Sequence, residues 1–221
     1  MHQYNFRAGH QMTVGRIIET PACVAEGAAW LSAQDPRFAD ALALTGPLPL
    51  RRKPDGFAQL LSAIVSQQVS VASANAIWNR LSAAKLTGPR KILWASDEDL
   101  RAAGLSRQKI RYARALAGAR INFKALRDVP TADVVTELTQ VSGIGIWTAE
   151  IYAMFSLGRA DVFAPGDLAL QESARLLFDL PERPKERALR DMAAAWSPWR
   201  SVAARLLWAY YHVAKDREGI R

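Results

Sequence analysis

The chain has 221 residues, of which half are hydrophobic, and a formal net charge of +8. This composition excludes a disordered chain, and the positive charge favours a polyanionic partner. Cys23 is the only cysteine, which excludes an internal disulfide and a four-cysteine iron–sulfur cluster. No apolar run is long enough to span a bilayer, and residues 1–12 lack the apolar core of a signal peptide. We therefore expect a cytoplasmic protein, nucleoid-associated if its source is bacterial.

Two helices are predicted in the first 50 residues, after a start (1–20) that carries no regular pattern. The first helix covers about 22–33. The second covers about 36–44, because Asp35 suits the N-cap position and a proline follows it at the first helical position. Beyond a short loop comes a cluster of three basic residues, Arg51, Arg52 and Lys53. This cluster is either a surface tuft or a contact to a nucleic-acid backbone.

The next helix is predicted over 56–66, with Asp55 as its N-cap and an apolar face formed by Phe57, Leu60, Leu61 and Ile64. Residues 66–70 interrupt this helix, and Ser70 can cap a following helix over about 71–81. No proline or glycine enforces the interruption, so one continuous helix is the alternative.

Two more helices are predicted in the middle of the chain. A short helix opens at Ser96 or Asp97 and ends near Gly104, and Ser106 caps a longer helix over about 107–119. Its apolar positions, Ile110, Ala113, Leu116 and Ala117, should face inward. The stretch 101–127 holds eight basic residues and no acidic one. Such a run is either a solvated face or a surface that follows DNA phosphates, and the absence of any opposite charge favours the second.

The stretch 141–145 is predicted to be a tight turn between two helices. Thr131 is placed to cap the first helix, over about 132–139, and the second helix has Trp147, Ile151, Met154 and Phe155 on one face. Gly143 and Gly145 allow positive φ and a close approach of the backbone to an anion. A helix N-terminus with exposed N–H groups can bind a phosphate without reading bases. The alternative is that the turn merely connects two helices.

The rest of the chain is also predicted to be helical. Asp167 stands at the start of a helix over 168–177, and further helices cover about 186–196 and the residues from Pro198 onward. The last of these has a repeating apolar face made of Trp199, Val202, Leu206, Leu207 and Tyr210. No stretch predicts a strand, so the expected fold class is all-α.

Two stretches together resemble one known family. Residues 143–149, GIGIWTA, followed by residues 161–167, DVFAPGD, are similar to the helix–hairpin–helix DNA glycosylase superfamily. The tryptophan after the hairpin indicates its alkylpurine branch, the DNA-3-methyladenine glycosylase II type. The resemblance covers about 57–211, and the short segment before it resembles the compact form. It implies two helical lobes flanking a cleft: residues 1–50 join the second lobe, 51–130 form the central lobe, and 131–221 form the hairpin and C-terminal lobe.

The resemblance also assigns roles to individual residues. Asp167 is implied as the catalytic carboxylate, and Asp161 is interpreted as a structural loop residue. Trp147, Trp208 and, more weakly, Tyr152 are implied as walls of the base-binding pocket. DNA contacts are implied for Gly143, Ile144, Gly145, Ile146, Thr148, Ser106 and Lys109. Gln68 stands where the family inserts a plug into the duplex, with Gln67 beside it. The family's hairpin binds a monovalent cation through backbone carbonyls, here those of Gln140, Val141 and Ile144.

The implied activity is hydrolysis of the N-glycosidic bond of alkylated purines in double-stranded DNA, by a monomer without a catalytic cofactor. The reaction passes through a cationic sugar that a carboxylate stabilises, and a flipped cationic base stacks well on tryptophan. An alkylated base leaves without a proton from the enzyme. Relatives that also cut the strand carry a lysine at position 147, so base excision without strand cleavage is expected.

Two other functions stay open at this point. The hairpin could serve a non-catalytic DNA-binding or damage-recognition protein, although neither Asp167 nor Trp147 is needed to hold a phosphate. A glycosylase for deaminated or ethenylated bases is the second alternative. A metal enzyme is not indicated, because His2, His10 and His212 show no metal-ligand spacing.

Overall fold

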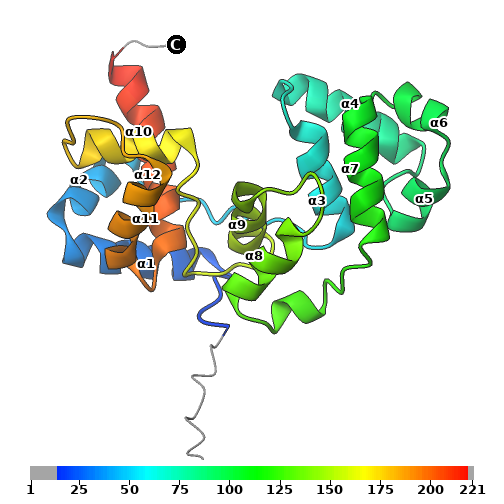
Figure 1. Ribbon diagram of the computed structural model, residues 1–221. Coiled ribbons are helices and arrows are strands. Elements are labelled where there is room, and N and C mark those ends of the chain that lie inside the picture. Colours follow the sequence, from blue (N-terminus) through cyan, green and yellow to red (C-terminus); the bar gives the residue numbers. More distant parts are fainter. Residues whose placement is uncertain (1–13, 219–221) are drawn as a thin grey trace, which may run out of the picture.

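The computed structural model describes residues 14–218, and in this part of the chain it contains twelve α-helices, two short 3₁₀ helices and no strand (Figure 1). The all-α prediction is confirmed. The helices are α1 Pro21–Gln34, α2 Pro36–Thr45, α3 Phe57–Ser66, α4 Val71–Ala83, α5 Pro89–Trp94, α6 Asp97–Ala102, α7 Arg107–Gly118, η1 Ala125–Arg127, α8 Thr131–Thr139, α9 Ile146–Phe155, α10 Leu168–Leu177, α11 Glu186–Ala193, η2 Ala194–Trp196 and α12 Arg200–Glu218. His2, His10 and the rest of residues 1–13 lie outside the described residues.

The helices form two groups, with α8 and α9 between them (Figure 1). In one group, α1 and α2 from the start of the chain pack with α10, α11 and α12 from its end. In the other, α3, α5 and α6 pack against α7, and α4 packs against α3. The segment 46–56 joins the groups directly, and the segment 156–167 leads from α9 back to the first group. Buried apolar side chains run through both groups as one connected core.

Local capping explains where several helices begin. The side chain of Asp35 accepts the N–H of Arg37 at 3.0 Å, and Ser70 accepts the N–H of Ser73 at 3.2 Å. Ser106 caps α7 in the same way, through the N–H of Lys109 at 3.2 Å. The predicted break between α3 and α4 is confirmed, and the alternative of one continuous helix is wrong.

Two predicted caps are wrong, each for a different reason. The carboxylate of Asp55 binds the guanidinium of Arg127, with Oδ2 2.6 Å from Nε, and Gly56 is the uncapped N-cap of α3. Helix α8 begins at Thr131 itself, because the carbonyl of Pro130 already accepts the N–H of Asp133 at 3.1 Å. Thr131 therefore stands inside the first turn, where its side chain makes no cap hydrogen bond.

Three further differences concern helix boundaries. The short helix α5 was not predicted, since its six residues are too few to show a periodicity. The helix expected over 186–196 changes to 3₁₀ geometry at Ala194, and α12 begins at Arg200 rather than at Pro198. None of these differences changes the face that α12 buries, on which Val202, Leu206 and Leu207 are fully buried.

Candidate functional site

The turn between α8 and α9 depends on one glycine for its shape. Gly143 has φ +96°, which L side chains rarely adopt, and a Cβ there would overlap the ring of Tyr112. The N–H of Ile144 closes the turn on the carbonyl of Val141 at 3.0 Å. Gly145 differs from the expectation, because its φ is −87° and a Cβ there would meet no atom within 4 Å. Gly143 is therefore required by the fold, whereas Gly145 leaves open space in front of the helix.

The N-terminus of α9 is exposed and uncapped. Gly145 is its N-cap and offers no side chain, and in the described part of the chain the N–H groups of Gly145, Ile146 and Trp147 have no acceptor. These donors, together with the positive end of the helix dipole, can hold an anion. Ile144 is buried, and so is the side chain of Thr148. Both can therefore reach a ligand mainly through the main chain.

The N-terminus of α7 opens onto the same hollow as the N-terminus of α9. This hollow has a volume of about 750 Å³, and its walls are the α8–α9 turn, the α3–α4 turn and the start of α7 with Gly104 and Ser106. Gly104 has φ +101° and ends α6 beneath the guanidinium of Arg80. Two helix N-termini that face one groove provide two places for backbone phosphates.

Gln67 and Lys109, both expected to contact DNA, are bound to main-chain carbonyls in the structure. The amide Nε2 of Gln67 donates to the carbonyl of Gly143 at 2.9 Å, which ties the α3–α4 turn to the hairpin. Lys109 is 9% exposed, and its Nζ donates to the carbonyl of Val65 at 2.6 Å. Burial lowers the pKa of Lys109. Gln68, in contrast, is exposed at the tip of the turn with φ +56°, so it is the residue that can project from this surface.

The basic run at 101–127 does not form one continuous positive surface. Folding brings Asp97 within 2.7 Å of the guanidinium of Arg114, and Arg101 contacts Asp97 and Glu98. Asp55 pairs with Arg127 in the same way. Four of the eight cations remain exposed with no ion pair among the described residues, namely Arg107, Arg111, Arg120 and Lys124.

Asp167 is held by hydrogen bonds at the start of α10. Its Oδ1 accepts the N–H groups of Ala169 at 2.9 Å and Leu170 at 3.1 Å, which makes it the N-cap of this helix. Its own N–H donates to the carbonyl of Ala164 at 3.0 Å. The amide of Gln171 also fixes the loop by donating to the carbonyl of Pro165 at 2.8 Å. Two main-chain N–H groups thus orient the carboxylate, and two further hydrogen bonds hold the loop that carries it.

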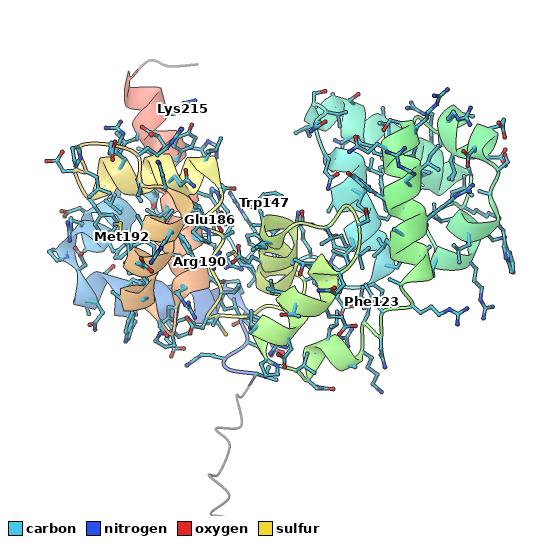
Figure 2. The ribbon with its side chains drawn as sticks, in the orientation of Figure 1. Phe123, Trp147, Glu186, Arg190, Met192 and Lys215 are labelled. Atoms are coloured by element: carbon cyan, nitrogen blue, oxygen red, sulfur yellow. The ribbon has the colours of Figure 1, made fainter. Side chains whose placement is uncertain are left out.

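Two indole N–H groups converge on this carboxylate. Trp147 Nε1 donates to Oδ2 at 3.1 Å, and Trp208 Nε1 donates to Oδ1 at 3.3 Å. Trp147 comes from the start of α9 and lies between α9 and the C-terminal group of helices (Figure 2). Its side chain is 45% exposed, whereas Trp208 is partly buried against Phe155, with ring centroids 5.8 Å apart. The structure thus brings together Asp167, Trp147 and Trp208, as the sequence predicted.

These three residues line a hollow of about 470 Å³. Its remaining walls were not predicted, and they are Ile151, Phe155, His212 and the linker residues Arg51, Arg52 and Lys53. The sequence placed Ile151 and Phe155 on the same helix face as Trp147, because they follow it at intervals of four residues, but it did not assign them to a pocket. Nothing in the local sequence predicts that Arg51, Arg52 and Lys53 line this hollow, because they precede Trp147 by about one hundred residues.

Tyr152 is not among the walls of the Asp167 hollow, which corrects its expected place beside the base. It follows Trp147 by five positions, so it lies on another side of α9. The side chain is 3% exposed, and its hydroxyl accepts the N–H of Gly56 at 2.8 Å. Burial raises the pKa of Tyr152 to about 12. Tyr152 and Thr148 instead line a neighbouring hollow of about 220 Å³ beside α3, which shares Lys53, Trp147 and Ile151 with the Asp167 hollow.

Two ion networks lie around the Asp167 loop, of which one joins α11 to α9 and the other joins the loop itself to α12. Arg190 of α11 donates to Glu150 of α9 at 2.8 Å and to Glu186 at 3.1 Å, and the Glu186 carboxylate lies beside Gly166 (Figure 2). Burial raises the pKa of Glu150, and the bond to Arg190 opposes this. Asp161 accepts the Nε of Arg200 at 2.6 Å, as fits a structural loop residue.

Metal-binding side chains are not gathered anywhere in the described residues, where no three His, Cys, Asp or Glu residues lie close enough to hold an ion. Within residues 14–218, no helix has both the length and the apolar character needed to cross a membrane.

Comparison with known proteins identifies relatives of this arrangement. Residues 61–199 match the family described as HhH-GPD superfamily base excision DNA repair protein. The chain is 31% identical over 178 residues to DNA-3-methyladenine glycosylase 1 of Schizosaccharomyces pombe, a match that covers 76% of this chain and 78% of the relative.

Two solved structures are similar in both sequence and fold. One is a DNA-3-methyladenine glycosidase from Bacillus halodurans, with a TM-score of 0.78, 34% identity and coverage of 91% of this chain and 94% of the other. The other is the S. pombe 3-methyladenine DNA glycosylase Mag1 in complex with abasic DNA. It has a TM-score of 0.73, 30% identity and coverage of 83% and 95%.

Proposed function

Because this chain belongs to the HhH-GPD superfamily of base excision DNA repair proteins, we propose that it is a monofunctional DNA glycosylase for alkylated purines. Its substrates are 3-methyladenine and related cationic bases in double-stranded DNA, as the names of its relatives suggest. The observation that carries this proposal is the pair of indole N–H groups bonded to the Asp167 carboxylate, in a hollow large enough for a base.

The two oxygens of Asp167 have different capacities. Among the described residues, Oδ1 accepts three hydrogen bonds, from Ala169, Leu170 and Trp208, whereas Oδ2 accepts only the indole N–H of Trp147. A carboxylate oxygen has two lone pairs, so Oδ2 retains the free acceptor site. We assign Oδ2 to face the sugar. There its negative charge stabilises the positive charge that develops as the glycosidic bond breaks.

The chemical step needs no proton from the protein. The N-glycosidic bond breaks with both electrons going to the base, which neutralises the positive charge of an alkylated purine. Water then adds to C1′ of the sugar, and its proton passes to Asp167 or to solvent. The faces of Trp147 and Trp208 favour a flat cationic base by stacking and cation–π attraction. Because tryptophan carries no amine, position 147 cannot form a Schiff base, and the product strand stays intact.

DNA is bound along the groove that the hairpin, the α3–α4 turn and the start of α7 line. The exposed N–H groups at Gly145 and Ile146 take one phosphate, and the start of α7 at Ser106 takes another. Gln68, at the tip of the α3–α4 turn, fills the space left in the duplex by the extracted base. Gln67 holds this turn by donating to the carbonyl of Gly143, and Lys109 holds it by donating to the carbonyl of Val65.

Three finer parts of the proposal concern the cation, the subdivision and the cellular setting. The carbonyls of Gln140 and Ile144 accept no hydrogen bond within residues 14–218, so they can join that of Val141 around a monovalent cation. The segments 1–50, 51–130 and 131–221 are proposed as the parts of one unit, supported by the packing of α1 and α2 on α12. We also propose a monomer acting in the cytoplasm, on the nucleoid if the source is bacterial.

The test is release of free bases from methylated duplex DNA by the protein and by Asp167→Asn, with abasic sites and strand breaks scored separately. We expect the protein to release 3-methyladenine and to leave intact abasic strands, and the variant to bind DNA without releasing the base. Retention without release by the unaltered protein would indicate a damage-binding protein. Release of only deaminated or ethenylated bases would indicate another lesion class. Borohydride trapping of a covalent complex would contradict the monofunctional reaction.

A further inference from the structure

The linker between α2 and α3 places a group of cations at the hollow that contains Asp167. Arg51, Arg52 and Lys53 all line this hollow, and all three are exposed. Gly143 and Gly145 line a different hollow, the groove of about 750 Å³. The linker cations are therefore separate from the phosphate grip of the hairpin.

These cations are not neutralised by the protein. Among the described residues, no carboxylate lies within ion-pair distance of Arg51, Arg52 or Lys53. The nearest acidic residue in sequence, Asp55, is already bound to Arg127. Asp167 bonds to the two indoles. The pKa of buried Arg205 is lowered to about 10, chiefly by burial, and the charges of Arg51 and Arg52 add to this effect. The positive charge of Arg51, Arg52 and Lys53 is thus concentrated at the Asp167 hollow and is not paired with carboxylates of the described residues.

The linker is fixed on both sides of the cations. The carbonyl of Leu50 accepts Nη2 of Arg205 from α12 at 3.1 Å, and the N–H of Lys53 donates to the carbonyl of Phe155 at the end of α9 at 3.0 Å. Arg51, between these anchors, has φ +51°, an unfavourable conformation for a residue with a side chain. Such conformations persist only where the surrounding structure enforces them, and they are concentrated at functional sites.

Arg52 differs from its two neighbours. Its guanidinium lies against the main chain of Gly158, where a Cβ would overlap it. Neither Arg51 nor Lys53 lies against a glycine of the described residues, although Lys53 shares with Arg52 the hollow beside Asp55 and Arg127. They are the two cations of the linker that are available to a ligand in the Asp167 hollow.

We propose that Arg51 and Lys53 form a second phosphate site, which binds a phosphate next to the flipped nucleotide while its sugar faces Asp167. This inference rests on the proposed function. A nucleotide that enters the hollow brings its flanking phosphates close to the Asp167 carboxylate, and like charges repel. Two unpaired cations at the same hollow offset this repulsion. The site therefore acts only on DNA whose nucleotide has left the stack, unlike the hairpin, which grips any duplex.

The test measures binding of Arg51→Gln/Lys53→Gln to three duplexes: undamaged DNA, DNA with a tetrahydrofuran abasic analogue, and the same analogue with neutral methylphosphonates on both sides. We expect affinity for the abasic duplex to fall about tenfold or more at low salt, with a salt slope reduced by about one for each lost contact. Affinity for undamaged DNA should change little. On the methylphosphonate duplex the variant and the unaltered protein should bind alike, because the phosphate charge that they would contact is gone.

The matched control is Arg90→Gln/Lys91→Gln, which removes the same charge from exposed residues of α5 that line neither hollow. Helix α5 lies in the outer part of the α3–α7 group (Figure 1). It should leave all three affinities nearly unchanged. An equal loss on all three duplexes by the linker variant, or the same loss in the control, would overturn the proposed phosphate site. Base release by the unaltered protein is measured in parallel. Release without a phosphate-specific effect rejects only this inference, whereas failure to release any base rejects the proposed function itself.

Discussion

The indole Nε1 of Trp147 donates a hydrogen bond of 3.1 Å to Oδ2 of Asp167, the oxygen with the free acceptor site. Trp208 donates to the other oxygen, Oδ1, at 3.3 Å, where two main-chain N–H groups are already bound. The two tryptophans therefore have different roles toward the same carboxylate. Trp147 alone orients the oxygen assigned to the sugar, whereas Trp208 is one of three donors on the oxygen that caps α10.

Replacing each tryptophan by phenylalanine separates orientation from stacking. Trp147→Phe keeps an aromatic face but removes the one donor that Oδ2 has within residues 14–218, so the single-turnover rate of base release should fall about tenfold or more. Trp208→Phe removes one of three donors to Oδ1 and should cost several times less. Rates are measured with saturating protein on methylated duplex DNA. Equal losses in the two variants would contradict the distinction between the two oxygens.

The two aspartates of the segment 161–167 should respond differently to the same change. Asp167→Asn retains a residue suited to the N-cap, so stability should change little, while base release falls by about a hundredfold or more. Asp161→Asn loses the charge that binds Arg200. It should lower the free energy of unfolding by about 1 kcal/mol and leave the release rate of the folded protein unchanged. Thermal unfolding and release assays on both variants check this, and a slow but stable Asp161→Asn would reverse the assignment.

The two glycines of the hairpin should also separate folding from binding. Gly143→Ala introduces a side chain at φ +96° and against the ring of Tyr112, so it should lower the free energy of unfolding by about 2 kcal/mol or more. Gly145→Val meets open space at an ordinary φ and should leave stability nearly unchanged. Its side chain would stand where a phosphate approaches, and so affinity should fall alike for damaged and undamaged duplexes. Normal duplex affinity of Gly145→Val would reject the phosphate grip.

Tyr152→Phe tests whether this residue belongs to the fold or to the base site. Loss of its hydroxyl leaves the N–H of Gly56 without its acceptor, which should lower the free energy of unfolding by about 1–2 kcal/mol. The rate of base release should not change, because Tyr152 is not a wall of the Asp167 hollow. A release rate reduced beyond the loss of folded protein would return Tyr152 to the base pocket.

The same variant has a consequence for alkaline stability. The folded protein holds the pKa of Tyr152 at about 12, above the ordinary value of 10.0, because burial disfavours the phenolate. The neutral phenol therefore stabilises the fold fully below pH 10, and this contribution is lost as the pH rises from 10 toward 12. In denaturant titrations over that range, the protein should lose more stability than Tyr152→Phe does. Parallel losses would contradict a buried, protonated Tyr152.

Features that depend on neighbours in sequence were predictable from the amino acids alone. Asp35, Ser70 and Ser106 cap helices through N–H groups two or three residues away, and no distant residue is needed for that hydrogen bond. The all-α fold follows from helical periodicity in the same way. The resemblance to the glycosylase superfamily, rather than any local pattern, implied that Trp147 and Asp167 belong to one site, although it did not give the hydrogen bond between them.

Which group each polar side chain binds was determined only by the tertiary structure. Asp55 has the same local setting as a cap, but Arg127 arrives from 72 positions away and binds its carboxylate. Lys109 belongs to a basic run, yet its ammonium is buried on the carbonyl of Val65. The linker cations of residues 51–53 reach the Asp167 hollow because α9 and α12 anchor the chain on both sides of them. The hydrogen bonds of a helix cap form within one helical turn and can be predicted from the local sequence. A charged side chain instead binds whichever group the folded chain brings near it, and the local sequence does not show which group that is.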